Sequence, residues 1–60
     1  MLIIQTEYAN FGNPTDLLKY MIEENIKVVH VTAKYCFTTF VNNLEMTVYD
    51  VKNWIKGDIK

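Results

Sequence analysis

The side chains best suited to nucleophilic catalysis are the single histidine, His30, and the single cysteine, Cys36. An imidazole that hydrogen-bonds a thiol can remove its proton and leave a reactive thiolate. On one continuous strand the two residues share a face but stand about 20 Å apart, at roughly 3.3 Å per residue. A three-residue loop over residues 33–35 makes them diagonal neighbours about 7–8 Å apart, whereas a two- or four-residue loop turns Cys36 to the opposite face. Because few registers join them and no third group orients the histidine, we expect no catalytic residues and no enzyme.

The other ionisable residues follow no ligand pattern. His30, Cys36 and the carboxylates lie at spacings that match no known metal-binding motif. The glycines, Gly12 and Gly57, are isolated from each other, whereas a phosphate-binding loop needs several glycines close together. We therefore expect neither a metal nor a cofactor.

A first helix is predicted upstream of the segment that holds His30 and Cys36. Asn13 suits the N-cap, Pro14 the first helical position, where its missing N–H costs nothing, and Asp16 the first turn. The spacing of the apolar residues that follow is that of one helical face. These residues are Leu17, Leu18, Met21 and Ile22.

A second helix is predicted near the carboxyl end. Thr47 is a suitable N-cap, and Asp50, three residues later, supplies the acidic partner of a capping box. Gly57 suits the C-cap. The apolar face of this helix comprises Val48, Val51, Trp54 and Ile55. An alternative start at Asn43 also fits the helical spacing, but two cap features favour the later one.

Strand patterns occupy the rest of the chain. Residues 2–8 alternate in part and predict a strand, and residues 9–13 predict a turn. Residues 27–41 are rich in strand formers, but one straight strand of that length would run about 50 Å. We expect this segment to break near Ala33, and Asn42-Asn43 to form a hairpin turn that leads into a short extra strand.

These elements predict an α+β fold in a single domain over residues 1–60. The order is β-α-β-β-(β)-α, with a three- to four-stranded antiparallel or mixed sheet and two helices on one face. A chain of 60 residues buries only about 60% of the surface that its unfolded state exposes, so its own core is marginal. One cysteine cannot form an internal disulfide, and association with another chain is the remaining remedy.

The aromatic content indicates where such an association would take place. Three Phe, four Tyr and one Trp are a large number for 60 residues, and interface cores favour aromatic side chains. We predict Tyr35, Phe37 and Phe40 as interface residues, because their segment is too long and too apolar for so small a sheet. The alternative is that they fill the core.

The function expected from these features is non-enzymatic protein binding by a homo-oligomer. Residues with AT-rich codons (Ile, Asn, Lys, Tyr, Phe and Met) greatly outnumber those with GC-rich codons (Gly, Ala, Arg and Pro). This bias suggests an accessory protein of a phage or mobile element, an inhibitor or adaptor that binds a larger host protein. The amino-terminal residues 1–8 resemble neither a signal peptide nor a membrane span. We expect a cytoplasmic location and no membrane partner.

Single-stranded nucleic-acid binding is the alternative function. The segment KYCFTTFV (Lys34–Val41) resembles the RNP1 segment of RNA-recognition motifs, in which a basic residue stands beside alternating aromatics. It departs from that segment at Tyr35, where RNP1 has glycine, and at Cys36, where RNP1 has an aromatic. The chain also has no arginine, and six lysines against seven acids give a net charge of −1. This balance favours a protein partner over a nucleic acid.

Overall fold

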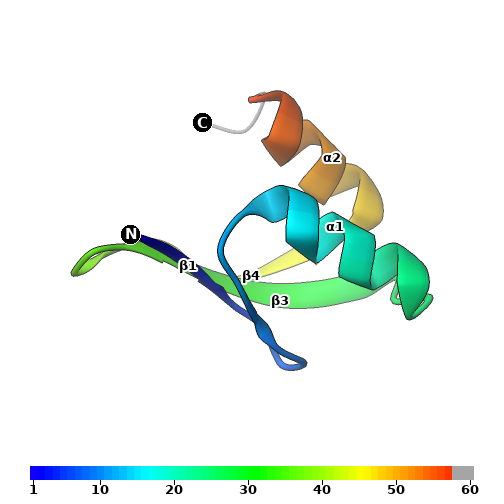
Figure 1. Ribbon diagram of the computed structural model, residues 1–60, viewed down its shortest axis with the longest axis horizontal. Helices are drawn as coiled ribbons and strands as arrows, with labels where there is room; N and C mark the ends of the chain where they lie inside the picture. The colour runs from blue at the N-terminus through cyan, green and yellow to red at the C-terminus, as the bar shows by residue number, and fades with distance from the viewer. Residues whose placement is uncertain (58–60) are drawn as a thin grey trace.

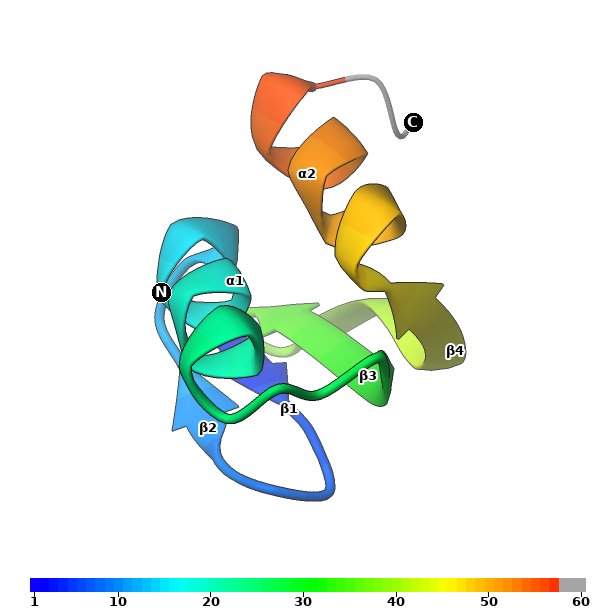
Figure 2. The same cartoon turned by 90° about the vertical axis from the view of Figure 1, so that its right-hand side faces the viewer.

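A four-stranded antiparallel sheet carries two helices on one of its faces in the computed structural model, which describes residues 1–57 (Figure 1). The strand order is β2-β1-β3-β4, with every neighbouring pair antiparallel. Figure 2 shows both helices on the same side of the sheet. The predicted α+β class and the placement of the helices are confirmed. The elements are β1 (Leu2–Gln5), β2 (Asn10–Phe11), α1 (Pro14–Glu23), β3 (Val28–Tyr35), β4 (Thr38–Thr47) and α2 (Val48–Lys56).

The core lies between the sheet and the helices. Alternate residues of β3 point toward the helices, so Val29, Val31 and Ala33 are buried, and Ile4 of β1 pairs with Ala33 on the same face. The helices contribute Leu17 and Met21 from α1 and Val51 from α2. The fully buried residues among those described are Ile4, Leu17, Met21, Val29, Val31, Ala33, Met46 and Val51. This small set is consistent with a domain whose own core is marginal.

Helix α1 begins as predicted. The Asn13 side chain accepts a hydrogen bond of 2.8 Å from the backbone N–H of Asp16, and Pro14 occupies the first turn. The predicted apolar face divides into two parts: Leu17 and Met21 are buried, Leu18 is half-buried, and Ile22 remains 60% exposed. One edge of this face therefore lies outside the core.

Helix α2 has the predicted capping box. The Thr47 hydroxyl accepts from the Asp50 N–H at 3.2 Å, and the Asp50 carboxylate accepts from the Thr47 N–H at 3.0 Å. Gly57 closes the helix with a φ of 84°, a left-handed conformation that favours glycine. The alternative start at Asn43 is wrong, because Asn43 lies within β4.

The predicted break in residues 27–41 is present, but it lies three residues after Ala33, the position where it was expected. The chain runs through Ala33 as part of β3 and turns at Cys36 and Phe37, so the segment forms two strands of one hairpin. Strand β3 is about 26 Å long at roughly 3.3 Å per residue, which fits within the 31 Å long axis of the molecule. No break at Ala33 is therefore needed.

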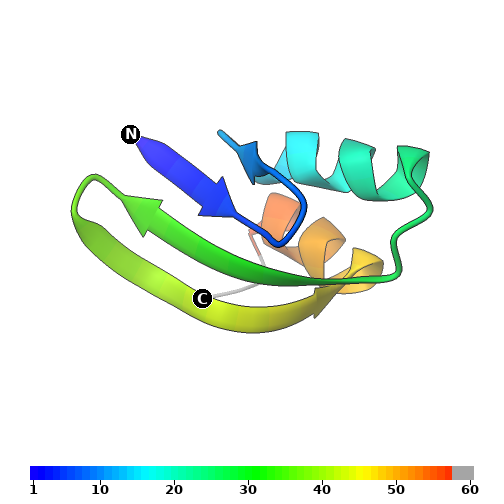
Figure 3. The ribbon, with the colours of Figure 1, turned by 90° about the horizontal axis from the view of Figure 1, so that it is seen from below.

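Asn42 and Asn43 form a β-bulge inside β4 instead of the predicted hairpin turn. Between the pairs Val31–Leu44 and Ala33–Val41, β4 has one residue more than β3. Asn43 adopts a φ of 51° and donates its N–H to the Thr32 hydroxyl at 3.0 Å. A second irregularity lies at Phe40, two residues before Asn42. Such irregularities increase local twist, and Figure 3 shows the curvature of β4 around the sheet.

The first strand is shorter than predicted, and a short strand follows it. The Thr6 hydroxyl accepts from the N–H groups of Tyr8 and Ala9 and donates to the Ala9 carbonyl. These bonds fold the chain back after Gln5, so that Asn10 and Phe11 pair with β1 as β2. The prediction of a strand through residue 8 missed this turn because a threonine hydroxyl that supports a turn is a weaker sequence signal than Asn, Asp, Gly or Pro.

Neither helix among residues 1–57 is long and apolar enough to cross a membrane.

Removing the α2 cap tests how far this helix depends on it. Thr47→Ala should lower the free energy of unfolding by about 1 kcal/mol, since it leaves an amide of the first turn without its partner. For a domain of this size the melting temperature should fall by about 4–8 °C. Thr15→Ala, the same change at an exposed first-turn position of α1 that is not the cap, should alter stability by less than about 0.5 kcal/mol. Equal losses in the two variants would contradict the capping role.

Candidate functional site

The predicted interface residues gather at the end of the β3–β4 hairpin. Tyr35 ends β3 and pairs with Thr38, which begins β4, so only Cys36 and Phe37 form the turn. Phe37 is fully exposed, Tyr35 is 60% exposed and Phe40 is 52% exposed. Figure 1 shows this end of the hairpin reaching away from both helices. We call Tyr35, Cys36, Phe37 and Phe40 the aromatic tip.

The turn at the aromatic tip has an unusual residue for its backbone conformation. Cys36 adopts a φ of 57°, a region that two-residue hairpin turns normally fill with Gly, Asn or Asp. For another residue this conformation costs on the order of 1–2 kcal/mol. The Cys36 N–H is bonded to the Met1 carbonyl at 3.0 Å, so the residue before β1 supports the turn. The next residue, Phe37, gains no burial from the fold. Neither residue of the turn therefore adds to the stability of the folded monomer: Cys36 has an unfavourable φ, and Phe37 is not buried.

Strand β4 lies at the edge of the sheet, beside the aromatic tip. Over residues 1–57 it pairs with β3 alone, so its outer edge presents backbone groups that another strand could pair with. The irregularities at Phe40 and at Asn42-Asn43 interrupt that edge. Bulges are one means by which proteins prevent edge-to-edge pairing. The aromatic tip is therefore a better candidate contact surface than the edge.

His30 belongs to a separate cluster on the face of the sheet opposite the helices. Its Nδ1 lies 3.0 Å from Oε2 of Glu7, and its backbone N–H donates to Oε1 of Glu7 at 2.9 Å. Glu45, its partner across β3 and β4, lies farther away, with Oε2 at 3.9 Å from Nε2. Glu7 lies within the turn between β1 and β2, so its carboxylate bonds His30 of β3 just beyond the last pair of β1 with β3. The cluster holds the β1–β2 turn against β3.

Hydrogen bonding shifts the pKa values of this cluster in opposite directions. The bond from His30 lowers the pKa of Glu7 below its ordinary 4.5, against a smaller opposing effect of desolvation. The bond to Glu7, with the negative charges of Glu7 and Glu45, raises the pKa of His30 above its ordinary 6.5. Both side chains are nearly half exposed, so solvent screens their attraction. No local pattern predicts this pair, because the two residues are 23 positions apart and meet only through the pairing of β1 with β3.

The structure does not bring His30 and Cys36 together. Both lie along one continuous run, six residues apart, which corresponds to about 20 Å at roughly 3.3 Å per residue. The loop over residues 33–35 that would have joined them is absent, because those residues belong to β3. Within residues 1–57, no three His, Cys, Asp or Glu side chains are placed to hold a metal ion.

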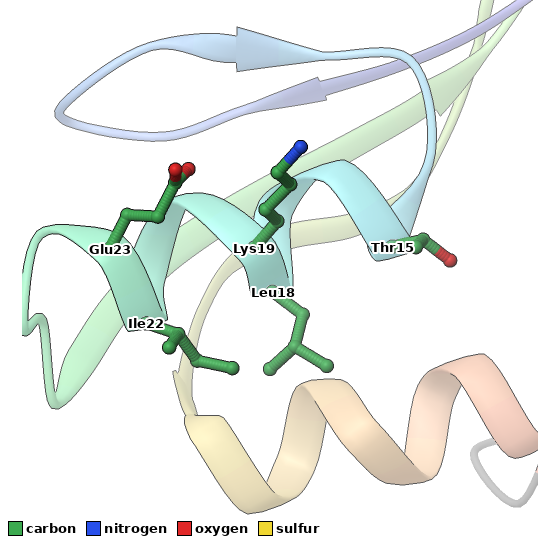
Figure 4. A pocket seen from close by; sticks show the side chains of 5 residues that line it. All are labelled: Thr15, Leu18, Lys19, Ile22 and Glu23. Atoms are coloured by element: carbon green, nitrogen blue, oxygen red, sulfur yellow. The ribbon is translucent and has the colours of Figure 1, made fainter.

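A second surface feature is an apolar groove along α1, which the sequence did not predict. Its volume is about 310 Å³, and Figure 4 shows the side chains of Leu18 and Ile22 pointing into the space between α1 and α2. The lining residues are Thr15, Leu18, Lys19, Ile22 and Glu23. The only signal in the sequence is that the apolar face of α1 is wide. Packing against the sheet buries Leu17 and Met21 and leaves Leu18 and Ile22 at least partly exposed. We call this feature the helix groove.

Comparison of the chain with known protein families, with curated proteins and with solved structures finds no match. The function must therefore be argued from the surfaces described above. Of these, the aromatic tip has the most exposed apolar side chain, and the helix groove has the concave apolar surface.

The cost of the turn conformation can be measured by comparing two substitutions at Cys36. Cys36→Gly should be more stable than Cys36→Ala by about 1 kcal/mol, because glycine has no Cβ to oppose a positive φ. Both remove the thiol, so their difference isolates the backbone effect. Urea unfolding of the two variants provides the measurement. A glycine variant no more stable than the alanine variant would contradict the left-handed conformation at Cys36.

The Glu7–His30 pair predicts a characteristic dependence of stability on pH. Glu7, whose pKa is lowered, contributes stability above pH 4.5 that is lost as the pH falls through its folded value. His30, whose pKa is raised, contributes stability below pH 6.5 that is lost as the pH rises through its folded value. The contribution of the pair is therefore largest between about pH 4.5 and 6.5.

Urea midpoints of the wild type and of Glu7→Gln, measured from pH 4 to pH 9, test this prediction. The difference between the two proteins should be greatest in the window from pH 4.5 to 6.5 and should shrink as the pH rises above 6.5 through the folded pKa of His30. Glu23→Gln, an exposed helix carboxylate, serves as the control and should track the wild type. A constant difference between wild type and Glu7→Gln at all pH values would show that the pair is not ionic.

Proposed function

We propose that this chain is a non-catalytic protein-binding protein, that the aromatic tip is its contact surface, and that its first partner is another copy of the chain. The observation that carries the proposal is the full exposure of Phe37 at the hairpin turn. The fold buries none of its side chain, and its neighbour Cys36 adopts an unfavourable positive φ. Burying a phenylalanine side chain is worth roughly 1.5–3 kcal/mol. The folded monomer gains none of this, whereas a complex would.

The composition of the aromatic tip also supports protein binding. Tyr and Phe are enriched in the buried centres of interfaces, while charged residues are depleted there. Tyr35, Phe37 and Phe40 are presented at one end of a single hairpin, so one partner surface can cover them together. The small set of fully buried residues adds a reason for association, because binding of the folded state to a partner stabilises it by mass action.

A finer proposal concerns the biological setting. The codon bias and the small size favour an accessory protein of a phage or mobile element, which inhibits or redirects a larger host protein in the cytoplasm. The aromatic tip would then serve both contacts, with self-association and host binding competing for it. The exposed thiol of Cys36 is compatible with a reducing compartment.

The positions of the aromatics favour protein binding over single-stranded nucleic-acid binding. RNA-recognition motifs stack bases on aromatics in the middle of the sheet face. Here Tyr35 and Phe37 lie at the hairpin end, while the sheet face opposite the helices carries Glu7 and Glu45 around His30. Two carboxylates on that face would repel a phosphate backbone.

Substitution of Phe37 tests the proposed function. Sedimentation velocity over a range of protein concentrations should show self-association of the wild type, and Phe37→Ala should weaken it at least tenfold, since exposed aromatic anchors carry much of an interface's affinity. At concentrations low enough for the wild type to be monomeric, the variant should keep the wild-type melting temperature, because the fold buries none of this side chain.

Tyr49→Ala is the matched control, because Tyr49 is another strongly exposed aromatic but lies on α2. It should associate as the wild type does. Equal association of the wild type and Phe37→Ala would contradict a role for the aromatic tip.

A further inference from the structure

We propose that the helix groove of one copy receives the aromatic tip of a second copy. The inference rests on the proposed function, and it adds the receiving surface and the geometry of the assembly. It assigns a role to an apolar hollow along α1 that the core does not use.

The helix groove has the structure of a receiving site. Its apolar floor consists of Leu18, which is half-buried, and Ile22, which remains 60% exposed although it lies on the apolar face of α1. Polar side chains surround this floor: Thr15, Lys19 and Glu23. An apolar centre with a polar rim is the usual arrangement of a protein interface.

The size of the groove suits aromatic rings. A cavity of roughly 150 Å³ lined by aliphatic side chains holds one benzene-sized ring. The groove, at about 310 Å³, has room for the ring of Phe37 and for part of a second ring, such as that of Tyr35. Figure 4 shows Leu18 and Ile22 on the side of α1 that faces α2 and Lys19 and Glu23 on another side of the helix, so the apolar and the charged lining residues are separated.

The groove and the tip of one copy cannot meet. Ile22 lies near the end of α1, which connects through residues 24–27 to the start of β3, whereas the tip follows the end of β3. The two ends of β3 are about 23 Å apart at roughly 3.3 Å per residue. Figure 3 shows the hairpin end at one side of the molecule and the end of α1 at the other. Contact between the two features must therefore be intermolecular.

Charges at the two surfaces are compatible with this contact. Lys34 precedes Tyr35 at the tip. On the rim of the groove, Glu23 carries a charge opposite to that of Lys34, and Lys19 lies one helical turn before Glu23. The interrupted edge of β4 makes strand-to-strand pairing a poorer route to association. The tip of one copy and the groove of the next thus offer an exposed aromatic side chain and an apolar surface to receive it.

The contact is heterologous, because it joins two different surfaces. Copies joined in this way form a closed ring or an open chain, whereas a contact of tip with tip would form a two-fold dimer. This difference allows a complementation experiment. A copy that has lost its tip and a copy that has lost its groove should each fail to self-associate, but should join each other once.

The experiment uses Phe37→Ala, which keeps the groove, and Ile22→Lys, which keeps the tip. Each variant alone should self-associate at least tenfold more weakly than the wild type in sedimentation velocity, and an equimolar mixture should form a heterodimer and nothing larger. Tyr49→Lys introduces the same charge at an exposed site outside the groove and should associate as the wild type does. Circular dichroism melting confirms that each variant is folded, and Ile22→Ala, a change that favours helix, repeats the test if Ile22→Lys unfolds.

The outcomes separate this inference from the proposed function. If the wild type associates through Phe37 but Ile22→Lys and Ile22→Ala associate equally well, the groove is not the receiving site and the proposed function stands. If each variant alone is monomeric and the mixture also stays monomeric while the wild type associates through Phe37, the two lost surfaces do not complement each other and the inference is wrong. If the wild type is monomeric at every concentration, the proposed self-association fails and the inference fails with it.

Discussion

The burial of alternate side chains of β3 is the constraint on which the rest of the structure depends. Val29, Val31 and Ala33 must all face the helices, so β3 has to run unbroken past Ala33, and the hairpin can turn only beyond it. This places Cys36 and Phe37 in the turn. The same alternation directs His30 to the opposite face, where Glu7 bonds it. One strand therefore organises the core, the ionic pair and the exposed tip.

The parts of the fold that could be predicted are those with local signals. The caps at Asn13 and Thr47 and the left-handed Gly57 were predicted because each depends on residues within one helical turn. The hairpin turn was misplaced because Cys36-Phe37 contains no turn-forming residue, while Asn42-Asn43 does and forms a bulge instead. Here the register of the sheet outweighs local turn preference, and register depends on contacts distant in sequence.

The candidate surfaces were predictable to different degrees. Composition and strand length point to Tyr35, Phe37 and Phe40, and the structure places all three at the surface. The helix groove could not be predicted, since only the packing of α1 against the sheet and α2 decides that Leu17 is buried and Ile22 exposed. The proposed contact joins the fully exposed Phe37 to the apolar groove along α1.

The central claim is that the folded chain associates with copies of itself through Phe37. Light scattering after size exclusion, with the wild type diluted through the micromolar range, tests it most directly. The mass should exceed that of one 60-residue chain at high concentration and fall toward it on dilution. A stable, folded species with the mass of a single chain at every concentration would contradict the account, because the monomer would then need no partner for its exposed aromatic tip.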